Sequence, residues 1–297
     1  MHAFYAAFRE ISQRIEERFA VDCELLLVND GSADASLAIM RELAQNDPRV
    51  HYLSFSRNFG KEAALYAGLK NADGDYVAVM DADLQHPPAM LEDMMAGLII
   101  EGYDCVSARR VSRKGEGFVR SFFSRSFYRL INSMSDTKLV DGATDFTMMK
   151  RQVVQAILSL QEVNRFTKGI NSWVGFETKW IPYENVARSA GKTTWSFRSL
   201  FLYSMQGILS FTTAPLAVTT LTGILLCLFA IIFMVVVLVR AVNYGEPVAG
   251  FPALICAICF IGGVQLLCLG IASQYLAKLY LEVKNRPLYI VKETSKL

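Results

Sequence analysis

Two carboxylates stand one residue apart in the stretch MDADLQHPP, directly after the apolar run YVAVM. Asp81 and Asp83 flank Ala82, so in an extended or turning backbone their side chains point the same way. Like charges held this close repel, and a site that keeps both ionised usually holds a cation. Hard oxygen ligands suit Mg²⁺ or Mn²⁺, which take their remaining ligands from water and substrate phosphates. Gln85 could add a ligand, and we interpret His86 as a loop residue.

Apolar runs and helical segments alternate along the first half of the chain. Strands are predicted at CELLLVN, VHYLSF, DYVAVM and DCVSAR, each preceded by a segment with helical spacing of apolar residues. This alternation predicts an α/β fold with a mainly parallel, Rossmann-like sheet that is covered on both faces.

Polar residues follow each of these four strands. In such sheets, ligands bind at the carboxyl ends of the strands. A turn and a helix cap would explain Asp30-Gly31-Ser32 taken alone. Four polar strand ends on one edge instead indicate a binding site, made by Asn29 and Asp30, Ser56 to Asn58, Asp81 and Asp83, and Arg109 with Arg110.

Two long segments, Pro215 to Val239 and Pro247 to Ala277, contain no charged residue. Each exceeds the roughly 20 residues that cross a hydrocarbon core, so we expect two transmembrane helices; two buried core helices are the alternative. The short loop between them makes the pair a hairpin. Lysine and arginine flank its outer ends, so the positive-inside rule predicts a cytoplasmic N-terminal domain and a cytoplasmic C-terminal tail.

The chain is therefore expected to have four parts. Residues 1–190 form the α/β domain, and residues 191–213 form an amphipathic, aromatic segment in the membrane interface or, alternatively, a core helix. Residues 214–283 hold the two spans, at about 215–240 and 251–278, and residues 284–297 form the tail. The charged N-terminal segment predicts no cleavable signal peptide, and a cytoplasmic domain predicts no disulfide.

Five ordered motifs resemble those of family 2 glycosyltransferases with a GT-A fold: VNDGSADAS, SRNFGKEAALYAGL, MDADLQHPP, DGATDFTMMKR and RSAGKTTWSF. More narrowly, the chain is similar to the polyprenyl-phosphate glycosyltransferases, the group of bactoprenol glucosyltransferase and dolichyl-phosphate mannose synthase. The similarity runs from about Glu24 to Pro287, and the hairpin that ends in KNRP matches the bacterial branch.

The resemblance implies a role for each matching acid. Asp30 would contact the nucleotide base, and Asp81 and Asp83, with Gln85, would hold Mg²⁺ or Mn²⁺ on the donor diphosphate, where Asp83 also takes part in catalysis. Asp145, in TDFTMM, matches the acid near the acceptor that is usually described as the catalytic base. A lipid monophosphate is already mostly a dianion at neutral pH. We therefore expect Asp145 to position the substrates more than to remove a proton.

Basic side chains are expected to neutralise the phosphates of acceptor and donor, since the planar fork of arginine suits phosphate. Arg188 and Lys192 lie just before the first apolar segment, where a lipid head group would arrive. Each candidate could instead be a solvated surface charge. The candidates are Arg109, Arg125, Arg188 and Lys192.

Two features depart from the family pattern. The family normally begins with a strand and a polar turn of the type VPxYNE, whereas this chain starts at the following helix, so we expect a truncated N-terminus and impaired donor binding. The chain also lacks the QxxRW motif of processive polysaccharide synthases. Transfer of one sugar per turnover is therefore favoured over chain extension.

The resemblance implies inverting transfer of one hexose, most simply from UDP-glucose, to undecaprenyl phosphate at the cytoplasmic face of a bacterial membrane. Alternatives are a donor such as GDP-mannose or a UDP-N-acetylhexosamine, and a catalytically silent membrane scaffold of the same fold. The resemblance also implies a homo-oligomer, such as a tetramer. The soluble half has no basic stripe interleaved with aromatic residues, so we expect no nucleic-acid partner.

Overall fold

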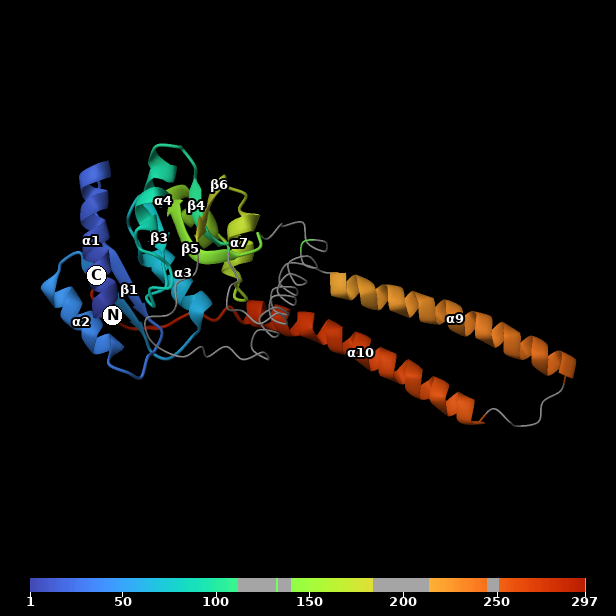
Figure 1. Ribbon diagram of the computed structural model, residues 1–297. Helices are drawn as coiled ribbons and strands as arrows, with labels where there is room; N and C mark the ends of the chain where they lie inside the picture. Colours follow the sequence, from blue (N-terminus) through green and yellow to red (C-terminus); the bar gives the residue numbers. More distant parts are fainter. Residues whose placement is uncertain (112–131, 133–139, 184–213, 245–250, 297) are drawn as a thin grey trace. The chain divides into compact units, whose positions relative to one another are not determined.

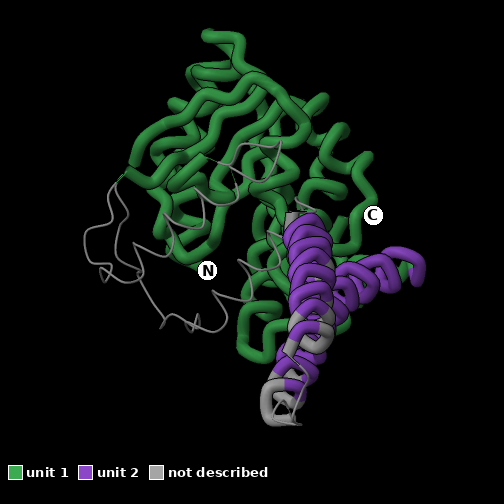
Figure 2. The backbone as a smooth tube through the Cα atoms, turned by 90° about the vertical axis from the view of Figure 1, so that its right-hand side faces the viewer, with its two compact units in different colours: residues 1–204, 285–297 green, residues 205–284 purple. Residues whose placement is uncertain are grey.

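The computed structural model of the protein describes residues 1–111, 132, 140–183, 214–244 and 251–296 (Figure 1). The chain divides into two compact units (Figure 2). Unit 1 comprises residues 1–204 and 285–297, and unit 2 comprises residues 205–284. The expected interfacial segment, residues 191–213, lies outside the described residues.

The first sheet of unit 1 has three described strands in the order β1-β2-β7: Leu25–Asn29, Val50–Phe55 and Val291–Thr294. β1 and β2 are parallel, because α2 (Ser36–Asn46) carries the chain back between them. β7 comes from the C-terminal end of the chain and pairs antiparallel with β2. Helix α3 (Lys61–Asn71) packs on this sheet through Ala67, which contacts the cluster around Phe55.

The second sheet has four described strands in the order β3-β5-β4-β6: Tyr76–Val79, Ala143–Lys150, Cys105–Arg110 and Thr178–Tyr183. β4 and β6 are parallel, but β5 runs antiparallel to both β3 and β4. The expected α/β class is confirmed. The sheets are mixed rather than mainly parallel, because β5 enters between β3 and β4 from the opposite direction.

One face of the second sheet is covered by α1 (His2–Phe19) and α4 (Met90–Ile99), and the cluster there includes Met94, Val106 and Phe146. Phe146 on β5 is fully buried against these helices. Because side chains alternate along a strand, Asp145 and Thr147 face the other side of the sheet. Helix α7 lies against that side of β5, and helix α6 follows the strand directly; their bounds are Thr167–Trp173 and Arg151–Ser159.

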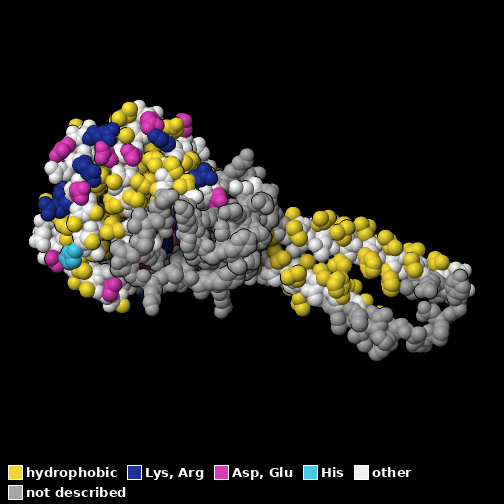
Figure 3. All heavy atoms as spheres, in the orientation of Figure 1, with side chains coloured by type: hydrophobic (Ala, Val, Ile, Leu, Met, Phe, Trp, Pro, Cys, Tyr) yellow, Lys and Arg dark blue, Asp and Glu magenta, His cyan; other side chains and the backbone are white. Residues whose placement is uncertain are grey.

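The described part of unit 2 consists of two long helices, α9 (Ala214–Tyr244) and α10 (Phe251–Lys284), which contact each other. The windows Pro215–Phe233 and Phe260–Lys284 have mean hydropathies of 2.5 and 1.5, and neither is buried inside the protein. Hydrophobic side chains cover the described part of both helices, whereas charged ones are spread over unit 1 (Figure 3). This exposure argues against the alternative of two core helices.

The segment after α10 returns to unit 1 and builds the edge of the first sheet. Tyr289 stacks on Phe55 of β2 with ring centroids 4.9 Å apart. Glu293 forms an ion pair with Arg41 of α2, and Lys296 lies 2.8 Å from Asp73. No helix or strand was predicted for this tail from its sequence. Its four-residue strand belongs to the same unit as the strands that precede α9.

Candidate active site

The two carboxylates of MDADLQHPP lie in a tight turn after β3. Leu84 has a φ of 58°, in the left-handed region that non-glycine residues rarely adopt. The turn brings the backbone N–H of Gln85 to 3.1 Å from Asp83 Oδ1, to which it donates. The structure thus places Asp81 and Asp83 at the carboxyl end of a strand, as the sequence analysis predicted.

Asp145 reaches the same place from β5. The pairing of β3 with β5 aligns Val79 with Thr147, and its continuation sets Asp145 opposite Asp81. Lys61, the first residue of α3, lies between the two carboxylates. Its Nζ is 3.0 Å from Asp81 Oδ2 and 2.6 Å from Asp145 Oδ2. One ammonium group therefore joins the two acids, which are 64 residues apart in the sequence.

The charges of this cluster are mutually compensating. Burial alone would raise the pKa of Asp145, but the ammonium groups of Lys168 and Lys61 outweigh it, so the pKa is lowered. Burial would likewise lower the pKa of Lys61, yet Asp145 and Asp81 raise it. Asp145 is the deeper acid, with 17% of its side chain exposed against 40% for Asp81. Asp145 is thus an ionised, shielded carboxylate at neutral pH.

The donor set fits a Mg²⁺ or Mn²⁺ site that a substrate completes. Among the described residues, no group of three or more His, Cys, Asp or Glu side chains is arranged to hold a metal. Asp81 and Asp83 still supply hard carboxylate oxygens from the same turn. Mg²⁺ is commonly held by one or two carboxylates together with substrate phosphates and water, which is the arrangement this pair allows. A role for the Gln85 side chain as a ligand stays a prediction.

His86 lies in the loop between β3 and α4, as predicted, and its ring is buried. It is 7% exposed, and its ring centroid lies 5.1 Å from that of Phe146 and 5.4 Å from that of Tyr183. Burial lowers its pKa. Within the described part of the chain, His86 Nδ1 has no hydrogen-bond partner. The imidazole therefore forms part of the wall behind the turn.

Asp30 holds the loop that leads into α3. Its two carboxylate oxygens accept the backbone N–H groups of Phe59 at 2.6 Å and Gly60 at 2.9 Å. Gly31 packs tightly against this loop, since a Cβ there would lie 2.4 Å from the carbonyl carbon of Arg57. Asp30 thus fixes the start of α3 and with it Lys61. Its contact with a nucleotide base stays a prediction.

Glu62 joins α3 to α7 on the other side of the cluster. Its carboxylate accepts the backbone N–H of Thr167 at 3.0 Å and also the hydroxyl of Thr167, the first residue of α7. Burial raises the pKa of Glu62, which the Thr167 hydrogen bonds only partly offset. This contact sets the position of α7, which carries Lys168 towards Asp145.

Of the four residues predicted to bind phosphate, only Arg109 lies in the described part of the chain. Arg109 is exposed, and its Nε donates to the backbone carbonyl of Asp141 at 3.0 Å. Arg125, Arg188 and Lys192 lie outside the described residues. Their role in binding acceptor or diphosphate stays a prediction.

Three charged residues of the site were not predicted: Lys61, Glu62 and Lys168. Lys61 and Glu62 lie in the motif SRNFGKEAALYAGL, where a polar KE pair opens an otherwise apolar helix. This polar pair at the start of an apolar helix is the feature of the sequence from which Lys61 and Glu62 could have been predicted. Lys168 lies in a short helix, and no sequence pattern distinguishes it from a surface lysine.

Comparison with known proteins identifies the family of this chain. Residues 5–158, about half of the chain, match the family described as Glycosyl transferase family 2. The chain belongs to this family, and the carboxylate cluster at the strand ends is the candidate active site of a glycosyltransferase with a GT-A fold.

Relatives match over nearly the whole chain. It is 47% identical over 274 residues to CsbB of Bacillus subtilis (strain 168), covering 92% of this chain and 83% of that protein. It is 39% identical over 297 residues to the SfII prophage-derived bactoprenol glucosyl transferase of Shigella flexneri, covering 99% and 93%. Among solved structures, glucosyl-3-phosphoglycerate synthase of Mycobacterium tuberculosis is 16% identical with a TM-score of 0.41, covering 68% of this chain and 71% of that one.

Proposed function

We propose that this protein transfers one hexose, with inversion, from UDP-glucose to undecaprenyl phosphate at the cytoplasmic face of a bacterial membrane. The observation that carries the proposal is the cluster of Asp81, Asp83 and Asp145, which gathers three acidic side chains where a sugar diphosphate and an acceptor would meet. The name of the Shigella flexneri relative, a bactoprenol glucosyl transferase, supports the choice of sugar and lipid.

The residues of the cluster divide the work. Asp81 and Asp83 would hold Mg²⁺ or Mn²⁺, which when bound neutralises charge on the leaving nucleoside diphosphate. Asp145 positions the acceptor or the sugar, and an oxygen of the acceptor phosphate attacks the anomeric carbon while the bond to the diphosphate breaks. Lys61 keeps the acids from repelling one another before substrates arrive, and it stays close enough to contact a phosphate afterwards.

The two long helices support a membrane location. α9 and α10 are long enough to cross a bilayer, and their apolar side chains are exposed: Leu225 is 58% exposed, Phe229 65% and Leu266 71%. A hairpin of two spans would bring the chain back to the side of unit 1, as the pairing of β7 with β2 requires. The positive-inside rule supports the cytoplasm as that side. Assembly into a homo-oligomer through these helices is part of the same proposal.

A donor panel tests the function. Membranes containing the protein are incubated with undecaprenyl phosphate and radiolabelled UDP-glucose, UDP-N-acetylglucosamine or GDP-mannose, with Mn²⁺ or with EDTA. We expect transfer from UDP-glucose that EDTA abolishes. Transfer from another donor would replace the sugar in the proposal. Metal-dependent nucleotide binding without any transfer would instead favour a silent scaffold.

Replacing Asp81 or Asp83 tests the proposed metal site. We expect Asp81→Asn and Asp83→Asn each to lower kcat/KM by at least about a hundredfold, because each loses a charged ligand that acts on the leaving group. The matched control is Asp22→Asn, an exposed aspartate. Full Mn²⁺-dependent activity in both variants would contradict the proposed metal site.

Asp145→Asn tests positioning against proton removal. The pKa of Asp145 is lowered in this site, and the acceptor phosphate ionises without help, so we expect a residual rate with the pH profile of the wild type. A general base would behave differently: the wild-type rate would fall at low pH as Asp145 takes up a proton, and the variant would lack that acidic limb. The kcat/KM profiles distinguish the two when they extend below pH 4, because the acidic limb of a carboxyl group with a lowered pKa lies there.

A further inference from the structure

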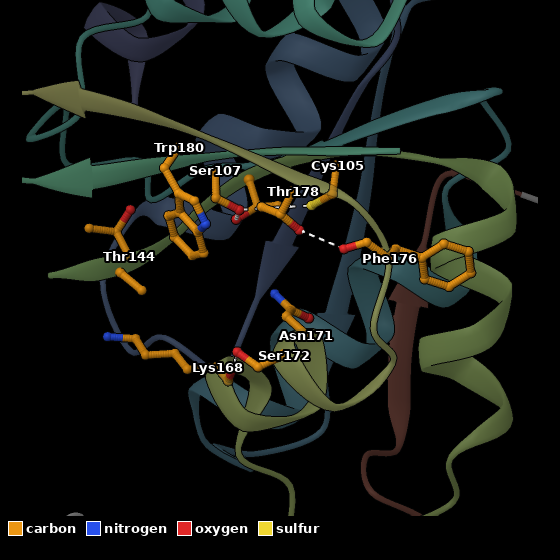
Figure 4. A pocket seen from close by; sticks show the side chains of 11 residues that line it. Cys105, Ser107, Thr144, Lys168, Asn171, Ser172, Phe176, Thr178 and Trp180 are labelled. Carbon is orange, nitrogen blue, oxygen red and sulfur yellow. Dashed lines mark hydrogen bonds between the residues drawn. The ribbon is translucent and has the colours of Figure 1, made fainter. Parts of the chain in front are cut away.

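A cavity of about 270 Å³ lies between the second sheet and α7. β4, β5 and β6 line one side with residues such as Thr144, Thr147 and Trp180, and α7 lines the other with residues that include Lys168. The side chain of Lys168 extends from α7 towards the part of the cavity where Thr144 lies (Figure 4). Thr144 directly precedes Asp145 on β5, so the cavity adjoins the candidate active site.

The strand order sets this cavity across β5 from the turn that carries the two aspartates. The order is β3-β5-β4-β6, and Asp81 and Asp83 follow β3. None of the described residues that line the cavity belongs to β3. Asp145 on β5 therefore lies between two places: the turn after β3, where Lys61 pairs with it, and the cavity on the side of β4 and β6.

Lys168 is the only charged residue among the described residues that line the cavity. Within the described part of the chain it forms no ion pair, whereas Lys61 forms two. The hydroxyl groups of Thr144, Ser172 and Thr178 each donate to a backbone carbonyl instead. Lys168 thus remains as a charged donor without a carboxylate partner, which suits an anionic ligand such as a phosphate.

We propose that Lys168 binds the phosphate of the lipid acceptor, which enters this cavity across β5 from the proposed metal site. The inference rests on the proposed function. When a sugar is transferred with inversion, the attacking group and the leaving group lie on opposite faces of the ring. A cavity across β5 from Asp81 and Asp83 meets this requirement.

The chemistry of a phosphate monoester fits the cavity. At neutral pH the group is mostly a dianion, so it accepts hydrogen bonds and its oxygen can attack without losing a proton. That oxygen forms a bond to the anomeric carbon while the diphosphate leaves with the electron pair of the broken bond. The volume lies just below the range of about 300–1,000 Å³ for drug-sized ligands, which fits a head group rather than a nucleotide sugar.

The backbone of Lys168 is held in place by a contact with α3. Thr167, which precedes it, gives its backbone N–H and its hydroxyl to the carboxylate of Glu62. The ammonium group also lowers the pKa of Asp145, which agrees with its direction in the cavity. A residue positioned in this way loses little conformational freedom when it binds a phosphate.

The test separates acceptor from donor in the full-length protein in detergent. Lys168→Met removes the charge from a long side chain, Lys168→Arg keeps the charge, and Lys70→Met, an exposed lysine on α3, is the control. With saturating donor at pH 8, we expect Lys168→Met to raise KM for undecaprenyl phosphate about tenfold, through the loss of one charge-assisted hydrogen bond. Lys168→Arg should keep most of the affinity. The Kd of UDP with Mn²⁺ should stay unchanged in all variants.

The outcomes separate this inference from the proposed function. If the wild type transfers sugar from no donor, the proposed function falls and this inference with it. If it transfers sugar but Lys168→Met leaves KM for the lipid unchanged, only this inference is overturned. Weaker UDP binding at an unchanged melting temperature would assign Lys168 to the donor diphosphate and also overturn it. Lys168→Gln takes the place of Lys168→Met if that variant melts earlier than the wild type.

A pH series distinguishes phosphate binding from an indirect effect. If Lys168 acted only by keeping Asp145 ionised, Lys168→Met would match the wild type at pH 8 and would lose activity only as the pH falls. That result would overturn the inference. A raised KM for the lipid at every pH supports direct binding.

Discussion

Lys61 lies between Asp81 and Asp145. A bound metal and the donor diphosphate would partly replace its ammonium group there. Its ion pairs with Asp81 and Asp145 balance charge in the absence of substrate. Because the ammonium group lies on Asp81 Oδ2, it competes with any cation that approaches that oxygen. The residue thus works against metal binding until a substrate phosphate joins the site.

Lys61→Met should therefore tighten binding of Mn²⁺ alone by about three- to tenfold, since a half-exposed ion pair contributes about 1 kcal/mol at most. Transfer should become slower, because the two acids lose a shared partner. Free Mn²⁺ can be followed by electron paramagnetic resonance during a titration without nucleotide. Lys70→Met, an exposed lysine on the same helix, is the control. An unchanged Mn²⁺ affinity would show that Lys61 does not compete.

The acids of the site were predictable from sequence, but their partners were not. Asp81 and Asp83 follow a recognisable strand, and Asp145 lies in a motif that resembles a family. Lys61 lies 20 residues from Asp81 and 84 from Asp145, and only the antiparallel pairing of β3 with β5 brings the three together. A single sequence contains no signal for that pairing.

At the scale of elements, the alternation of strands and helices was predicted because each has its own apolar period. β5 was not, since its insertion between β3 and β4 is decided by long-range contacts. β7 was not predicted either, because the short sequence VKET has exposed faces and no apolar repeat. Elements formed by local patterning were thus accessible, whereas strands specified by their neighbours were not.

The junction of α1 with the loop before β2 gives a pH prediction. Asp47 accepts hydrogen bonds from Arg49 at 3.0 Å and from the hydroxyl of Tyr5 at 2.9 Å. The hydrogen bonds from Arg49 outweigh the effect of burial and lower the pKa of Asp47 to about 2. A lowered carboxyl pKa stabilises the fold above the unfolded value near 4, and this contribution disappears as the pH falls towards 2.

Asp47→Asn should then lower the free energy of unfolding by about 1–2 kcal/mol at pH 7, and the difference from the wild type should shrink between pH 5 and pH 3. Thermal unfolding of the detergent-solubilised protein measures it. Asp22→Asn should show no such trend, since this aspartate is exposed. A difference that stays constant over this range would mean that Asp47 acts through packing rather than charge.

At the scale of the whole molecule, the C-terminal tail that follows α10 packs against the first sheet of unit 1. Tyr289 is its anchor, stacked on Phe55 and accepting a hydrogen bond from Asn71 at 3.2 Å. The ion pairs of Glu293 and Lys296 are partly exposed and contribute less to stability by comparison. The tail is therefore part of the fold of unit 1 rather than a free extension.

Tyr289→Ala should lower the free energy of unfolding of unit 1 by about 1–3 kcal/mol, roughly half the cost of truncating a fully buried aromatic residue. Limited proteolysis should also release the tail sooner. Lys292→Ala, an exposed side chain on β7, should leave both unchanged. Equal stability of the two variants would show that the tail docks without supporting the sheet.

The place of β7 in the first sheet has a consequence for how the chain is made. The ribosome synthesises β1 and β2 early, but their partner strand emerges only after both apolar helices are complete. Domains generally fold as they are made, from the N-terminus onwards. If α9 and α10 span a bilayer, as proposed, β1 and β2 have to wait for β7 until both helices have been inserted. A failure of insertion would then also leave the first sheet incomplete and expose the chain to proteolysis.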